Sequence, residues 1–211
     1  MPTTHLPVSW EFLDGTARQV AEVMGEPVPE VVLKEGHLGQ QWAVMHQKLP
    51  VDPGLLAHLE PDEATFWIAF LLVHLRENRV MKSTGGFPFS KNSRYRQMFP
   101  DFLYAFLPGL ALATIIPFAV FGLPTVFLPI VILPLMVLAS GLMLHFMSRG
   151  QRKVMASIFR DTTAITGNEE AGRSLMKKWT VFRWTKRGTK PLRGLGKLMA
   201  HYQYWIMTPG Y

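Results

Sequence analysis

The chain has 211 residues, a net charge of +7, 48% hydrophobic residues and no cysteine. Without cysteine it has no disulfide, no thiolate metal site and no cysteine nucleophile, which fits cytoplasmic exposure. The sequence also lacks the motifs of serine hydrolases, P-loop proteins and dinucleotide-binding folds. The N-terminus has neither a basic region nor an apolar run, so no signal peptide is predicted.

The first part of the chain predicts a short helix and a small β-hairpin. Apolar residues recur at helical spacing over residues 15–25, and Gly25 suits the C-terminal cap. Residues 30–34 have the β-branched content of a strand, and Glu35-Gly36 is a turn signal. We expect a second strand at residues 41–46 to pair with the first as a hairpin.

A short helical turn is predicted after Asp52, and a long buried helix follows over residues 61–82. Pro61 with Asp62 and Glu63 indicates a helix start, because proline fits the first turn and acids favour the positive end of the helix dipole. The helix is apolar nearly all round as far as His74. Such a helix is buried, and its apolar part is too short to span a membrane.

Residues 102–147 are the most apolar part of the chain and contain no Asp, Glu, Lys or Arg. A bilayer core about 30 Å thick needs roughly 20 apolar residues in a helix, so this stretch suffices for two spans. Gly122-Leu123-Pro124 would supply the turn between them. Both flanks are basic, which places both termini on the cytoplasmic side of the inner membrane. The predicted fold is a mainly α, multi-pass membrane protein, with a two-helix transmembrane hairpin inserted in a small α+β cytoplasmic domain.

After the hairpin, the second helix is predicted to continue to about Thr166. Gly167 would end it, and Asn168 would cap the next helix. The final stretch, residues 197–207, is amphipathic and aromatic, which suits a membrane interface.

We therefore expect three parts. These are a cytoplasmic N-terminal part (1–101), the hairpin (102–147) and a cytoplasmic, helical and basic C-terminal part (148–211) that packs with the first.

Charge is distributed unevenly over these parts. Residues 1–63 carry ten acidic and three basic residues, whereas residues 171–211 carry nine Lys and Arg and no acid. Anionic lipid would attract the basic segments. We expect membrane lipid and other integral membrane subunits as partners, and no nucleic acid. The residues predicted to contact a membrane surface or a partner are Arg94, Arg96, Arg149, Arg152, Lys153, Lys177, Lys178, Arg183, Trp184, Lys186, Arg187 and Trp205.

Three stretches of the chain, in order, carry a resemblance to a known family. They are AEVMGEPVPEVVLKEG, VDPGLLAHLEPDEATFWIAFLLVHLREN and RKVMASIFRDTTAITGNEEAGRSLMKKW. They resemble the short helix and strand, the zinc helix and the ligand helix of the membrane zinc metallopeptidases of the HtpX and CaaX-endopeptidase type. In an H-E-x-x-H motif, two histidines bind zinc and the glutamate activates water, while a later glutamate completes the site. The resemblance covers roughly residues 15–180 and implies a metallopeptidase-like domain around the hairpin.

The matching positions lack most of that zinc site. Phe70 stands at the first histidine, Leu71 at the catalytic glutamate and His74 at the second histidine. On the later helix, Ser157 replaces the ligand glutamate and Asp161 matches the family's aspartate. Two of three ligands and the general base are missing, so we expect no bound metal and no catalysis. The resemblance then implies a pseudo-peptidase that serves as an accessory or structural subunit of a larger membrane protein complex.

Two alternatives stay open. One is a membrane zinc metallopeptidase with a rearranged site, in which His74 would act with Asp161, His145 or His46. The other is a membrane-anchored adaptor that binds acidic partners or nucleic acid through the basic tail. In the accessory-subunit reading, His74 bonds a carboxylate such as Asp161 or a backbone carbonyl. No cofactor is predicted, although a bound lipid or pigment would fit beside the proline-rich hairpin.

Overall fold

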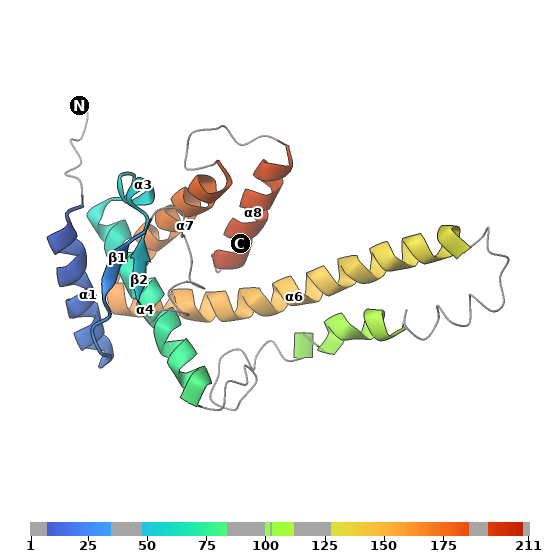
Figure 1. The fold of residues 1–211 in the computed structure, drawn as a ribbon, viewed down its shortest axis with the longest axis horizontal. Helices are drawn as coiled ribbons and strands as arrows, with labels where there is room; N and C mark the ends of the chain where they lie inside the picture. Colours follow the sequence, from blue (N-terminus) through green and yellow to red (C-terminus); the bar gives the residue numbers. More distant parts are fainter. Residues whose placement is uncertain are drawn as a thin grey trace. The chain divides into compact units, whose positions relative to one another are not determined.

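The computed structural model describes residues 8–34, 48–83, 100–101, 103–111, 128–185 and 194–208 of the chain. The chain divides into two compact units (Figure 1). One unit comprises Met1–Phe87 with Met155–Tyr211, and the other comprises Pro88–Val154.

The first unit is mostly helical, and α4 lies at its centre. Along the chain the described elements are α1 (Trp10–Met24), β1 (Val31–Leu33), β2 (Leu49–Val51), α3 (Pro53–Leu56), α4 (Pro61–Ser83), α6 (Leu128–Thr166), α7 (Glu169–Trp184) and α8 (Leu195–Met207). Both α1 and α7 pack against α4, and α8 packs against α7 (Figure 1). The C-terminal end of α6, from Met155, belongs to this unit.

Helix α1 begins earlier than the sequence predicts, at Trp10, because Ser9 caps it. The Ser9 hydroxyl accepts the Phe12 N–H at 3.2 Å. Gly25 ends the helix with a φ of 64°, a left-handed conformation that favours glycine. Leu13, Ala17 and Ala21 are buried at four-residue spacing, so one face of α1 faces the core.

The two described strands, β1 and β2, form a parallel pair. Val31 pairs with Leu49, and Leu33 pairs with Val51. The strand predicted at residues 41–46 lies outside the described residues. All three residues of β2 are buried. A strand buried on both faces lacks the apolar–polar alternation that identifies strands in sequence, which explains why β2 was not predicted.

Helix α4 begins at Pro61, where the sequence predicts a helix start, and its body is enclosed by protein. Phe66, Phe70 and Leu71 are completely buried, and Trp67 is 2% exposed. The Glu63 carboxylate accepts the Glu60 N–H at 2.8 Å and so caps the first turn. Burial of each large apolar side chain stabilises the folded state by about 1.5–3 kcal/mol, so α4 makes a large contribution to the stability of the unit.

The junction of α6 and α7 is set by two neighbouring residues. Gly167 has a φ of 70°, and the Asn168 side chain accepts the Ala171 N–H at 3.0 Å. A close approach follows at Gly172, where a Cβ would lie 2.9 Å from Cζ of Phe159 and 2.5 Å from Cε2 of Phe66. Glycine at this position therefore lets α7 pack tightly against α4 and α6.

The second unit contains helical residues 100–101 and 103–111 and the part of α6 up to Val154. These two helices lie side by side (Figure 1). Nζ of Lys153 is 2.6 Å from Oδ2 of Asp101, and the rings of Tyr104 and Phe146 are 5.6 Å apart. An ion pair and a ring contact therefore join the two helices.

The predicted transmembrane hairpin is wrong, because none of the helices in the described ranges is both long enough and apolar enough to cross a membrane.

The fold class and the localisation are corrected accordingly. The described fold is mostly helical with a two-stranded parallel sheet, and not a transmembrane hairpin inserted in an α+β domain. The assignment to a multi-pass protein of the cytoplasmic membrane, with both termini in the cytoplasm, is wrong for the same reason. The turn predicted at Gly122-Leu123-Pro124 lies outside the described residues.

Candidate functional site

On α4, the positions that match the zinc helix of the peptidases form part of a packed core. Phe70 and Leu71 are completely buried, and His74 is 2% exposed. The Phe70 ring meets the His74 ring edge-on with centroids 4.8 Å apart, and it stacks on Trp67 at 6.2 Å. Phe70, which stands where the peptidase motif has its first histidine, is therefore part of the apolar core.

The matching positions on α6 lie beside α4. Asp161 accepts a hydrogen bond from Arg76 at 3.2 Å and forms an ion pair with it, which joins the two helices. Ser157 is partly exposed one turn earlier. The two helices that carry the resemblance, α4 and the end of α6, are therefore neighbours. The carboxylate of Asp161, which a metal ion at this place would need as a ligand, is already paired with Arg76.

Among the residues the structure describes, no cluster of three or more His, Asp or Glu side chains could hold a metal ion. His74 lies in the first unit and His145 in the second. His46 lies outside the described residues.

Several residues predicted to contact a membrane surface or a partner are engaged within their own unit. Nζ of Lys178 lies 2.7 Å from Oε2 of Glu63 and 3.9 Å from Oε1 of Glu60, and Lys153 pairs with Asp101. The Arg183 guanidinium lies 5.4 Å from the centre of the Trp179 ring. The partners of Lys178 and Lys153 lie far away in the chain, whereas Trp179 lies one helical turn before Arg183.

The remaining predicted contacts have varied positions. Arg149 and Lys177 are exposed, and Arg152 is partly exposed. Trp205 is partly buried and stacks on Tyr202 with ring centroids 6.1 Å apart. The side chain of Trp184 is not described, and Arg94, Arg96, Lys186 and Arg187 lie outside the described residues.

A groove between α3 and α7, which the sequence does not predict, lies in the described part of the first unit. It has a volume of about 550 Å³ and is lined by Leu55, His58, Ser174, Lys177, Lys178, Val181 and Phe182. Apolar and cationic side chains share this α3–α7 groove. No local pattern in the sequence identifies it, because the two sides come from elements more than a hundred residues apart.

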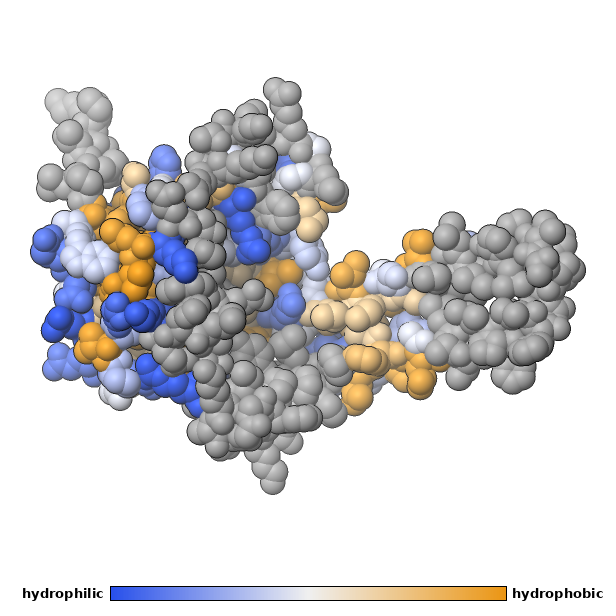
Figure 2. Space-filling view, viewed as in Figure 1, coloured by the Kyte–Doolittle hydropathy of each residue, from blue (hydrophilic) through white to orange (hydrophobic). Residues whose placement is uncertain are grey.

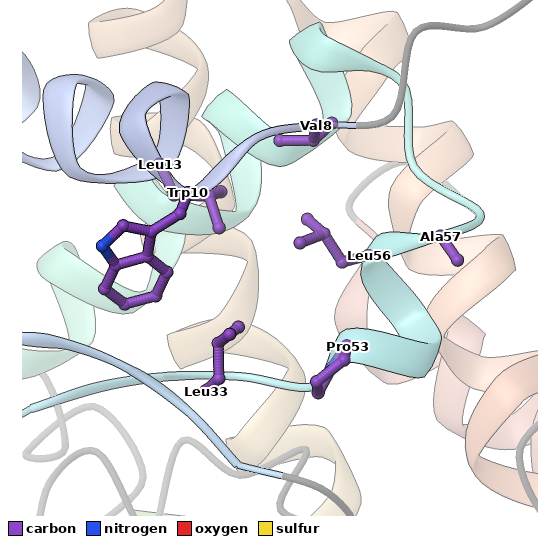
Figure 3. A pocket seen from close by; sticks show the side chains of 7 residues that line it. All are labelled: Val8, Trp10, Leu13, Leu33, Pro53, Leu56 and Ala57. Carbon is purple, nitrogen blue, oxygen red and sulfur yellow. The ribbon is translucent and has the colours of Figure 1, made fainter.

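A second hollow, of about 260 Å³, lies where the start of α1, β1 and α3 meet. Figure 3 shows Trp10 and Leu13 from α1, Leu33 from β1, and Leu56 from α3 around it. The labelled side chains are apolar except for the indole N–H of Trp10, so few polar groups could orient a ligand here.

The second unit exposes apolar side chains on both of its described helices. We define the apolar helix surface as Leu103, Leu107, Val137, Leu138 and Leu144, whose exposed fractions are 50%, 54%, 67%, 61% and 65%. In Figure 2, orange and pale orange apolar residues predominate over the coloured part of this unit, with white and pale blue residues between them. Monomeric proteins rarely expose large apolar patches, and such patches mark interaction sites.

Comparison of the chain with protein-family models, with curated proteins and with solved structures finds no match.

Proposed function

We propose that this chain is a non-catalytic accessory subunit that binds a partner protein through the apolar helix surface. The observation that carries the proposal is the exposure of Leu107, Val137 and Leu144, each more than half exposed. From residue 137 to residue 145, nearly every side chain of α6 is exposed. A helix that is apolar on all sides is normally covered, so a bound partner would stabilise this one.

The chemistry of this surface indicates the kind of partner. Neither residues 103–111 nor residues 137–147 contain Asp, Glu, Lys or Arg. A partner that fits therefore presents an apolar helix face, in the manner of helix-in-groove recognition. Arg149 is exposed just beyond the surface. An acidic residue at the end of the partner's apolar stretch would complement it and set the orientation.

The non-catalytic part of the proposal rests on the resemblance to zinc peptidases and on the residues that stand at the positions of their zinc motif. Phe70 and Leu71 replace a ligand and the general base, and both are completely buried in a packed interior. Arg76 engages Asp161.

The test is affinity purification of the tagged full chain from its own cells. The variant Leu103→Gln/Leu107→Gln makes two exposed side chains of the surface polar, while Val23→Gln changes a single exposed residue on α1 that is 67% exposed. We expect a stoichiometric partner with the wild type and with Val23→Gln. Burial of each leucine contributes about 1.5–3 kcal/mol, so the double variant should lose at least tenfold in recovery. A chain that purifies alone, or a partner retained by the double variant, would contradict the proposal.

A further inference from the structure

We propose that the α3–α7 groove binds a small amphipathic anion, with a carboxylate or phosphate head and an apolar chain. Five of its lining residues come from α7, at positions 174, 177, 178, 181 and 182. This spacing places them on one face of the helix. Leu55 of α3 and His58 line the groove with them, and its volume of about 550 Å³ is in the range of small-molecule sites.

The polar end of the groove is cationic. Lys177 is exposed and takes part in none of the ion pairs found among the described side chains. Nζ of Lys178 donates to Glu63 at 2.7 Å. An ammonium group has three donors, so the others remain for a ligand. The Ser174 hydroxyl on the α7 side and the His58 ring on the α3 side can supply further donors to the groove.

The buried carboxylates near the groove are already satisfied and do not line it. The Glu63 side chain is 3% exposed and accepts both the Lys178 ammonium and the Glu60 N–H. Asp52 is 2% exposed and accepts the Gly54 N–H at 2.8 Å. Glu60 is exposed, but its carboxylate is 3.9 Å from Lys178 and it does not line the groove. An anionic head is therefore favoured over a cationic one.

The other end of the groove is apolar. Leu55 and Phe182 are almost completely buried and form its floor, while Val181 is 40% exposed at the rim. Phe182 is packed closely against Gly54, since a Cβ on Gly54 would lie 3.1 Å from Cζ of Phe182. The groove thus accommodates an apolar chain whose head lies at the two lysines.

Isothermal titration calorimetry of the full chain tests the proposal with four probes of equal chain length. Decanoate and decyl phosphate carry an anionic head, decanol is neutral, and decyltrimethylammonium is cationic. We expect saturable binding of one anion per chain, at least tenfold tighter than decanol or the cation. Tighter binding of one of the two anions identifies the head group. No saturable anion binding, or equal affinity for decanol, would overturn the proposal.

Variants locate the site. Lys177→Gln should weaken anion binding about tenfold, as expected for the loss of one charge-assisted hydrogen bond. Lys197→Gln is the matched control, because Lys197 is an exposed lysine on α8 that does not line the groove. Ser174→Trp should abolish binding by filling the groove. Equal effects of Lys177→Gln and Lys197→Gln, or full binding by Ser174→Trp, would place the anion elsewhere and overturn the assignment.

Discussion

The Lys178 ammonium donates a 2.7 Å hydrogen bond to the Glu63 carboxylate, although 115 positions separate the two residues in the chain. The Glu63 side chain is 3% exposed and the Lys178 side chain is 33% exposed. The pair therefore ties α7 to the first turn of α4, the helix on which the first unit is built. Lys178, which the sequence predicts to contact a membrane surface or a partner, thus also makes a contact within the first unit.

Lys178→Met should destabilise the protein by about 1–3 kcal/mol, between the values for an exposed and a buried ion pair. The reason is that Glu63 would keep its burial but lose its cationic partner. Urea unfolding measures the change. Lys177→Met is the control, since Lys177 is exposed, and its effect should stay within about 0.5 kcal/mol. Equal effects of the two variants would show that the Glu63 contact contributes nothing.

Gly172→Ala should also destabilise the first unit, by about 1–3 kcal/mol, because the added methyl would overlap the rings of Phe66 and Phe159. Phe66 is completely buried and Phe159 is 1% exposed, so neither ring can move into solvent. Thermal unfolding provides the measurement. Gly141→Ala is the matched control within α6, where nothing lies within 4 Å of the new Cβ. That change should stabilise the helix by up to about 1 kcal/mol. Stabilisation by Gly172→Ala would contradict the close approach of α7.

Addition of a metal chelator should leave the thermal unfolding midpoint of the protein unchanged. If His74 held a structural or catalytic zinc ion, removal of the metal would lower stability through the lost binding free energy. Thermal unfolding with and without a chelator, together with metal analysis of the purified chain, tests this. We expect the same midpoint in both conditions and no stoichiometric zinc. A zinc-dependent midpoint that disappears in His74→Ala would support the rearranged peptidase and contradict a non-catalytic subunit.

Helix boundaries were predictable where the signal is local. Pro61 and Gly167 mark the start of α4 and the end of α6, and Asn168 caps α7, as the sequence indicates. A cap is made by residues close together in the chain, so its pattern survives in the sequence. The start of α1 was missed because Ser9 caps a turn whose residues Trp10 and Glu11 are exposed and give no apolar periodicity.

Features made by distant parts of the chain were not predictable. The parallel pairing of β1 with β2, the Lys178–Glu63 pair and the α3–α7 groove all join residues that share no local pattern. The hydropathy of residues 102–147 predicts two transmembrane spans, and this prediction gave the wrong fold class, because no helix among the described residues is long and apolar enough to cross a membrane. The resemblance to zinc peptidases and the role of the chain in a complex stay predictions.

The central claim is that a partner protein covers the apolar helix surface. The most direct measurement places a photo-cross-linking amino acid at position 107, on this surface, and in a second variant at position 23 on α1; Leu107 is 54% exposed and Val23 is 67% exposed. Irradiation in the native cells should link position 107 to one partner protein in high yield and position 23 to none. Links of equal yield from both positions, or a link from position 107 only to a second copy of this chain, would contradict the account.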